Sequence, residues 1–336
     1  MALFGRGRRD APREEPESPV LDPLGASADA APEVAEPVPE VGISLSTYGK
    51  PAGRPAATPP APADPAALGA GRDARPAPGA PGLPDNAVLR AALAALPEKP
   101  DNADVLNVMR QALQGTLYLR VRGNAKQLIA ENKELPLAVA SIEDQRFLLA
   151  FTGGGALQDS IRADNGATTS AVGQPVMNVL RNVLAGPYAG LIIDQASARA
   201  RIVLPRELIQ TSVDQADPAL AIKNLLSTPR TDRTAALVVE ALTTTKTWVA
   251  VGPADEDGRR GIAEVRTADG ERRLEVFSHP LEVLALGRGD QPAPVDPEQL
   301  ARAVAGDPGI VGLIVDPAGP WLQIERAQLT PLLDRV

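Results

Sequence analysis

Residues 146–160, RFLLAFTGGGALQDS, combine the residue types of a phosphate-binding loop. An apolar run ends at Phe151, three glycines follow, and a helical pattern begins at once. A Walker A loop would also need a lysine, and a dinucleotide fingerprint would need a further spaced glycine. Because both are missing, we interpret Gly153–Gly155 as a sharp strand-to-helix turn that uses positive φ angles, with Thr152 as the helix N-cap. We expect this turn to bind no nucleotide tightly.

His279 is the only histidine, so any serine-hydrolase triad or histidine metal site would have to include it. It lies in FSHPLEV, at the start of an expected helix with Ser278 as N-cap, and the chain has no GxSxG motif. We interpret it as a turn histidine. The acidic loop at 253–261 lacks the spacing of a calcium loop, and residues 143–146 are typical of a hairpin turn.

Asp194 and Asp316 each follow an apolar strand pattern, and we interpret each as the first residue of a turn. The chain contains no cysteine, which excludes disulfides, thiolate metal sites and cysteine nucleophiles. We therefore expect no catalytic residue, no cofactor-binding residue, no cofactor and no metal ligand. The corresponding prediction is a protein that is not an enzyme.

Composition narrows the kinds of partner. Hydrophobic residues make up 44% of the 336-residue chain, and the formal net charge is −8. This charge argues against a protein that binds nucleic acid by neutralising phosphates. No run of about 18 apolar residues occurs, so we expect no membrane helix. No apolar segment follows the basic start, so we expect no signal peptide and a cytoplasmic location.

Residues 1–84 hold half of the chain's 34 prolines and show no hydrophobic periodicity. Such a segment cannot bury enough apolar surface to offset the entropy lost on ordering, so we predict a disordered arm that is dispensable for folding. We interpret the short island at 41–50 as a slightly apolar linker patch, with a docking motif as the alternative. The PxxP spacing from Pro59 to Pro62 carries little information in so proline-rich a segment.

An internal repeat begins near residue 85. In each copy, a short amphipathic helix opened by an aspartate is followed by a proline break and a second helix. A strand with one large aromatic, Tyr118 or Trp248, comes next. A hairpin follows and ends on Phe151 or Phe277 before a small hydroxyl residue. We therefore expect Tyr118 and Trp248, and likewise the two phenylalanines, to occupy equivalent positions in one sheet order.

The two copies agree best near their ends, where GLIID and GLIVD are followed by a second strand and a helix. Each copy predicts the order α-α-β-β-β-α-α-β-β-α. Two hairpins require antiparallel strand pairs, and the helical crossover before GLI allows one right-handed parallel pair. The predicted fold class is α/β (α+β), with a mixed sheet and packed helices in each copy.

We call residues 85–213 the first repeat and residues 217–336 the second repeat. A linker at about 211–216 is so short that we expect the two repeats to touch.

Residues 103–212 contain four short motifs, LYLRV, FLLAFTGGGAL, GLIIDQ and ARIVLPRELI. In these motifs the segment resembles the N-terminal domain of SseB-type proteins, named for enhanced serine sensitivity. Residues 232–336 carry a weaker version of the same pattern. Asp194 and Asp316 stand where the family more often has asparagine. The resemblance implies a mixed α/β fold in each copy and brings no established reaction with it. The high arginine, alanine and proline content is typical of bacteria with GC-rich genomes.

Together these observations favour a non-enzymatic protein that acts through an unknown protein partner, without nucleic acid or membrane. The alternative is a regulator that binds a small molecule or nucleotide, at the turn of residues 152–155 or in a cleft between the repeats. A polar pocket shared by both copies would favour the alternative, and an exposed apolar patch would favour the protein partner.

Overall fold

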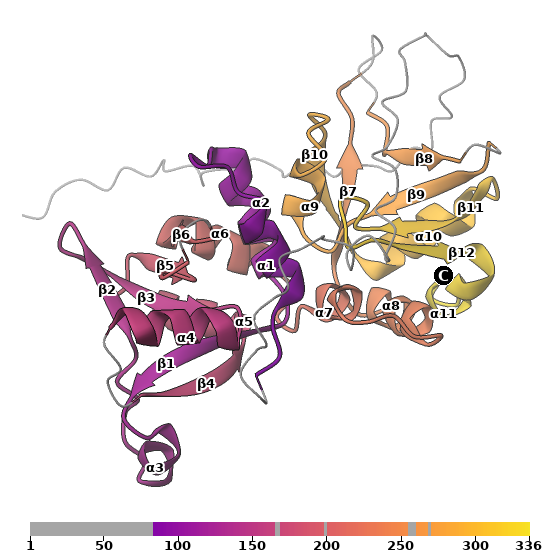
Figure 1. Cartoon of the computed structure of the whole chain (residues 1–336). Helices are drawn as coiled ribbons and strands as arrows, with labels where there is room; N and C mark the ends of the chain where they lie inside the picture. The colour runs from indigo at the N-terminus through magenta and orange to yellow at the C-terminus, as the bar shows by residue number, and fades with distance from the viewer. Residues whose placement is uncertain (1–82, 165–168, 198–199, 255–259, 268–269) are drawn as a thin grey trace, which may run out of the picture. The chain divides into compact units, whose positions relative to one another are not determined.

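Six strands and six helices form the first repeat in the computed structural model of the chain (Figure 1). The structure describes residues 83–164, 169–197, 200–254, 260–267 and 270–336. All of them lie within one compact unit. The predicted disorder of residues 1–84 lies almost entirely outside the described residues.

The elements of the first repeat are α1 (Ala87–Ala94), α2 (Asn102–Ala112), β1 (Thr116–Arg122), α3 (Ala125–Ala130), β2 (Val139–Ile142), β3 (Gln145–Phe151), α4 (Gly154–Ala163), β4 (Thr169–Pro175), α5 (Val176–Ala185), β5 (Gly190–Ile193), β6 (Ile202–Pro205) and α6 (Arg206–Gln215). The sheet order is β4-β1-β3-β5-β6, and β2 pairs with β3. The hairpins β2–β3 and β5–β6 are antiparallel, whereas β3 and β5 are parallel. The predicted mixed sheet with one parallel pair across the helical crossover is confirmed.

The elements of the second repeat are α7 (Ala221–Ser227), α8 (Thr234–Leu242), β7 (Thr247–Val251), β8 (Glu264–Arg266), β9 (Arg272–Val276), α9 (Pro280–Leu284), β10 (Gln291–Val295), α10 (Pro297–Gly306), β11 (Ile310–Val315), β12 (Leu322–Glu325), a short 3-10 helix (Arg326–Leu329) and α11 (Thr330–Leu333). The strand pairs β10–β7 and β12-β11-β9-β8 form two ladders, which an isolated bridge joins. The resulting order is the same as in the first repeat.

Strand register places the equivalent aromatic residues at equivalent points. Tyr118 on β1 lies opposite Phe151 on β3, and Trp248 on β7 bridges Phe277 after β9. Both phenylalanines are fully buried. The expected correspondence of these aromatic positions is therefore confirmed.

The side chains of β1 point alternately to the two faces of the first sheet, and each face carries its own hydrophobic core. Leu117 and Leu119 pack in the larger cluster with α1, α2, α5 and α6. Tyr118 packs on the opposite face with Phe151 and with Leu157 of α4. The second repeat has the same division, with α9 on the face that α4 covers in the first.

Two edge strands and one helix were not predicted. The polar sequence of β4 (TSAVGQP) and the prolines of β10 (QPAPV) lack an alternating apolar pattern, because an edge strand needs neither a fully apolar face nor every N–H. Helix α3 is a short helix in which only Ala125 is buried. The expected linker at 211–216 is mostly helix, since α6 continues to Gln215.

The expected hairpin turn at 143–146 is present but shorter, because Ile142 pairs with Gln145, the first residue of β3. The two turn residues, Glu143 and Asp144, have positive φ angles. The second predicted hairpin, β8–β9, is also present. Two residues of its expected turn, at 268–269, lie outside the described residues. So does most of the acidic loop at 253–261.

Residues 83–86 belong to the folded first repeat. The Tyr118 hydroxyl donates to the carbonyl of Pro84 (2.8 Å), and Leu83 packs in the cluster around Tyr118. Asn86 caps α1, and its side-chain amide donates to the Gln114 carbonyl (3.0 Å). A boundary before Leu83 therefore fits these contacts better than the expected one after residue 84.

A chain that begins at Leu83 is expected to melt within about 3 °C of the full chain, because that difference corresponds to about 1 kcal/mol. A chain that begins at Ala87 loses the α1 cap and the Tyr118–Pro84 hydrogen bond. We expect a drop of roughly 4–8 °C, equivalent to about 2 kcal/mol. Calorimetric melts of the three chains measure both effects, and equal melting temperatures for all three would contradict the role of residues 83–86.

Candidate functional site

Asp194 and Asp316 occupy the same point in the two repeats, directly after β5 and β11. Both have left-handed backbone angles (φ 52° and 50°), which aspartate tolerates better than most residues. The carbonyl of Asp194 accepts from the N–H of Ser197 (2.9 Å), and that of Asp316 accepts from the N–H of Gly319 (2.8 Å). The prediction that each aspartate begins a turn is confirmed.

Their carboxylates make a second kind of contact, which the sequence interpretation missed. Asp194 accepts hydrogen bonds from the backbone N–H (2.8 Å) and the hydroxyl (2.6 Å) of Thr152. Asp316 accepts the same pair from Ser278, at 2.7 and 2.6 Å. Turn formation therefore does not fully account for these residues, because each carboxylate also joins the ends of two parallel strands.

Burial changes the acidity of both groups. Asp194 is 3% exposed and Asp316 is 2% exposed. Loss of hydration raises the pKa of Asp194 to about 6, against the opposing effect of the Thr152 hydrogen bonds. Burial and the nearby Glu282 carboxylate raise the pKa of Asp316 to about 7. Both carboxyl groups thus titrate closer to neutral pH than an exposed aspartate does.

The predicted N-caps are wrong, because both hydroxyls are directed at the aspartate carboxylates and accept no hydrogen bond from the first N–H groups of the helices. Helix α4 begins after Gly153, which makes no side-chain cap. Helix α9 begins after His279, whose Nδ1 accepts from the N–H of Leu281 (3.1 Å). Thr152 and Ser278 bind the buried aspartates instead.

The glycine turn does not use positive φ angles as expected. Gly153 has φ −179°, an extended conformation open to any residue. The reason for a glycine is space, because a Cβ at this position would overlap the Asp85 carboxylate. The N–H of Asn86 also donates to the carbonyl of Thr152 (2.7 Å). Asp85 and Asn86 therefore cover the turn that resembles a phosphate-binding loop. That this turn binds no nucleotide tightly stays a prediction.

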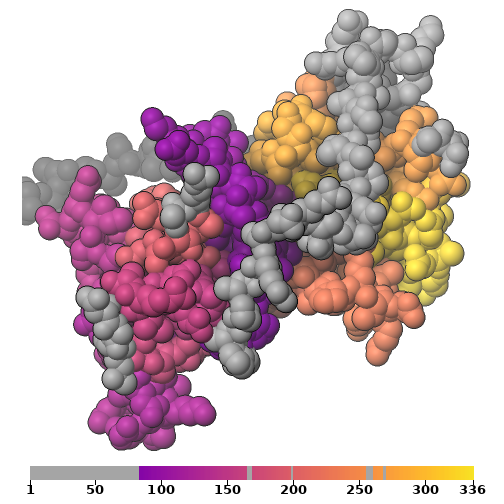
Figure 2. Space-filling view, viewed as in Figure 1, coloured from indigo at the N-terminus to yellow at the C-terminus, as the bar shows by residue number. Residues whose placement is uncertain are grey.

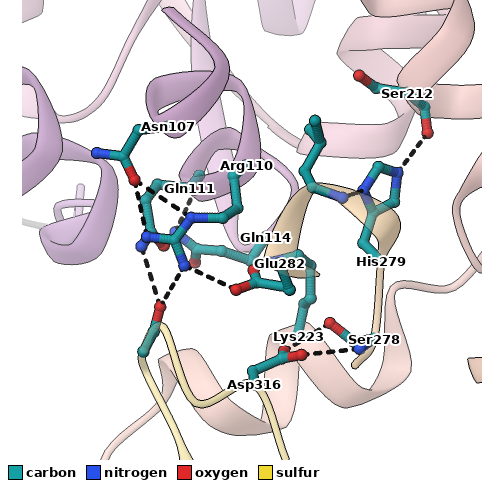
Figure 3. Close-up of polar contacts among 12 residues, drawn as sticks. Asn107, Arg110, Gln111, Gln114, Ser212, Lys223, Ser278, His279, Glu282 and Asp316 are labelled. Atoms are coloured by element: carbon teal, nitrogen blue, oxygen red, sulfur yellow. Dashed lines mark hydrogen bonds and ion pairs between the residues drawn. The ribbon is translucent and has the colours of Figure 1, made fainter. Parts of the chain in front are cut away.

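A buried ionic cluster covers the equivalent turn of the second repeat (Figure 3). Glu282 on α9 is fully buried. Its carboxylate forms ion pairs with Arg110 Nη1 of α2 (2.7 Å) and with Lys223 Nζ of α7. Burial alone would raise the pKa of Glu282, but the two cations hold it below its ordinary value. The cluster therefore contains an ionised carboxylate between two cations that are each 5% exposed.

Arg110 also binds the turn that follows β11. Its Nη1 donates to the Gly319 carbonyl (2.7 Å), which accepts from Gln111 Nε2 as well (3.1 Å). Asn107 accepts from Arg110 Nε (3.2 Å) and Nη2 (2.8 Å), which fixes the guanidinium on α2. These contacts join the first repeat to the second, in agreement with the expectation that the repeats touch.

His279 is 1% exposed and is the N-cap of α9. Because its Nδ1 accepts a hydrogen bond, Nε2 carries the proton and donates to the Ser212 carbonyl of α6 (2.9 Å). Burial lowers the pKa of His279 to about 4, so the ring is neutral near pH 7. Its structural role as a turn residue fits the prediction, and both ring nitrogens are engaged.

A groove of about 450 Å³ opens on the α5 face of the first sheet. It is lined by apolar, amide and other polar side chains: Leu119, Glu134, Leu135, Leu137, Val172, Gln174, Asn178, Val179, Asn182 and Tyr188. Apolar surface and side-chain amide groups therefore meet in this groove.

A family model described as the SseB protein N-terminal domain matches this chain twice, over residues 89–211 and 221–330. The chain belongs to the SseB family. The two matched segments of this SseB chain contain the two equivalent sheets, and each holds one buried aspartate–hydroxyl pair. No curated protein and no solved structure gives a significant match to the chain.

Two further observations concern the described part of the SseB chain. It holds no cluster of three or more histidine, aspartate or glutamate side chains suited to a metal ion. None of its helices combines the length and the apolar composition needed to cross a membrane.

Sequence reasoning did not single out Arg110, Lys223 or Glu282. A signal was present, since Lys223 lies in LAIKNLL and Arg110 in NVMRQAL, where a charge interrupts an otherwise apolar helix face. Such positions indicate a buried partner of opposite charge. The sequence contained no indication of which carboxylate would lie opposite.

Proposed function

We propose that this SseB-family chain is a non-enzymatic binding protein of the cytoplasm that acts by engaging a protein partner. The groove on the α5 face of the first repeat carries the proposal. It offers apolar side chains together with the side-chain amides of Gln174, Asn178 and Asn182, as protein recognition surfaces do. We expect neither nucleic acid nor membrane to take part, in line with the net charge of −8.

Three buried titratable groups with large pKa shifts support a non-enzymatic role. Asp194, Asp316 and His279 each hydrogen-bond to protein groups and are almost fully buried. An enzyme usually places such groups in a cleft that its substrate can reach. Here they hold strand ends and helix starts together.

A small-molecule ligand is the alternative, and the size of the groove favours it. A volume of about 450 Å³ falls within the range of ordinary ligand pockets. At the two sites first considered for a ligand the chain contacts itself, since Asp85 covers the turn at Gly153 and Arg110 bonds to Glu282 and Gly319 where the two repeats meet. A ligand would therefore bind in the groove.

The proposal is tested by capturing partners from the native host on the full chain and then reconstituting the binding with purified partner. Asn178→Arg in the groove is expected to weaken the reconstituted complex at least tenfold, or about 1.4 kcal/mol. The matched control is Gln158→Arg on the exposed surface of α4, which should leave affinity within about twofold.

A purified partner that binds wild type and Asn178→Arg equally would remove the groove as the functional surface. Failure to reconstitute any complex, together with a melting-temperature rise with one member of a metabolite set, would replace the proposal with the small-molecule alternative.

A further inference from the structure

The equivalent edge strands of the two repeats, β4 and β10, differ in where they contain proline. Strand β4 pairs only with β1 among the described strands, and β10 pairs only with β7 (Figure 1). Register makes Ala171 of β4 equivalent to Pro292 of β10, and Gly173 equivalent to Pro294. Proline has no N–H, so this difference decides whether an edge can accept another strand.

The direction of the backbone groups on β4 follows from its partner. The carbonyl of Arg120 on β1 accepts from the N–H of Ala138, on the side away from β4 (2.8 Å). In an antiparallel pair, residues opposite each other point either both inward or both outward. Ala171, opposite Arg120, and Gly173, opposite Tyr118, therefore direct their N–H and C=O groups to the free edge.

The same argument shows that the β10 edge is blocked. Trp248 exchanges both of its backbone hydrogen bonds with Phe277, each at 2.8 Å, on the side away from β10. Pro294, opposite Trp248, and Pro292, opposite Ala250, are then the outward residues. Both outward donors are absent from β10, whereas both are present on β4.

The groove lies directly beside this open edge. Val172 and Gln174 alternate with the outward pair and line the groove from the α5 side. Side chains of an added strand would stand about 5 Å from them on the same face. Glu134 is the one charged residue among the described lining residues, and the whole chain carries a net charge of −8.

We infer that β4 is the docking edge for an extended, basic segment of a protein partner. The segment adds a strand beside β4, bonds the N–H and C=O groups of Ala171 and Gly173, and places alternate apolar side chains in the groove. Its positive charge is opposite in sign to that of Glu134 at the groove and to the net charge of −8 of the whole chain. This inference rests on the proposed function and specifies the partner's chemistry.

A second copy of the chain is a less suitable occupant. Two chains of charge −8 repel each other. Helix α3 also stands at the start of β4, where the N–H of Ala125 donates to Ser170 Oγ (2.8 Å), and it projects from the surface of the first repeat (Figure 2). A single narrow peptide strand fits beside this helix more easily than the edge of a second sheet.

Two nine-residue peptides probe the edge, one alternating valine with lysine and one alternating valine with glutamate. We expect the lysine peptide to bind the full chain at least tenfold more tightly than the glutamate peptide in calorimetric titration. Ala171→Pro gives β4 a proline at the position equivalent to Pro292 of β10 and should weaken binding of the lysine peptide at least tenfold. Ala171→Ser keeps the N–H and should leave binding within about twofold.

Amide hydrogen exchange on the wild-type chain gives a second measurement that does not depend on the folding of Ala171→Pro. The amides of Ala171 and Gly173 should exchange rapidly in the free chain and at least tenfold more slowly with the lysine peptide. Protection of both amides without peptide, or equal binding by the proline and serine variants, would overturn the inference. So would a concentration-dependent dimer that Ala171→Pro abolishes.

The capture experiment separates this inference from the broader function. A native partner that binds Ala171→Pro as tightly as wild type would refute docking at β4 and leave a protein-binding function intact. Absence of any partner would refute the function itself.

Discussion

Replacing Glu282 with alanine is expected to lower the free energy of unfolding by about 3–5 kcal/mol. The carboxylate is fully buried and forms ion pairs with Arg110 and Lys223, which are buried as well. Its removal leaves two cations in a region of low dielectric without a counter-charge, and it also removes a hydrogen-bond acceptor from each. Urea unfolding at neutral pH measures the loss.

The matched control is Glu240→Ala on α8, an exposed glutamate in a helix of the same repeat. Its effect should stay within about 0.5 kcal/mol, as for most surface changes. A loss below about 1 kcal/mol for Glu282→Ala would mean that water reaches Arg110 and Lys223, contrary to the burial described above.

Replacing Asp316 with asparagine is expected to change how stability depends on pH. A carboxyl whose pKa rises from 3.8 in the unfolded chain to about 7 in the folded chain binds more protons when folded. Its contribution to stability is therefore complete below pH 4 and is lost as the pH rises towards 7 and above. Three units of pKa correspond to at most about 4 kcal/mol.

Asparagine does not titrate and can keep both contacts with Ser278, through its carbonyl oxygen and its amide group. The free energy of unfolding of Asp316→Asn, relative to that of wild type, should therefore rise by about 2–4 kcal/mol between pH 4.5 and pH 8. Asp194→Asn should show the same sign over a smaller range, since the pKa of Asp194 is about 6. A difference that stays constant with pH for both variants would show that neither carboxyl titrates in this interval.

Duplication made the fold predictable beyond what a single copy allows. The apolar runs of β3, β5 and β11 carry strong patterns because they are buried on both faces, and the helical crossover between two of them allowed a parallel pair. The edge strands β4 and β10 were missed because hydrogen bonding to one neighbour defines them, and their side chains lie at the margin of the core. Periodicity cannot reveal a strand of that kind.

The polar contacts were harder to predict than the fold. Local rules gave the turn at Asp194 and the helix start at His279, since both depend on neighbours in sequence. The bonds from Asp194 to Thr152 and from Arg110 to Glu282 cross 42 and 172 residues of chain, and no local rule pairs such residues. The same limit applies to Gly153, whose need for space comes from Asp85.

The bonds of Arg110 with Glu282 and Gly319 have a consequence for the history of the duplicated gene segment. A second repeat cut free at residue 216 would expose Glu282 and Lys223 to water, and the first repeat would keep an arginine on α2 with Asn107 as its remaining partner in this cluster. At this position the other copy has Glu240, whose charge has the opposite sign. The two halves have therefore specialised for one another, and exchanging or reordering them would not regenerate the same protein.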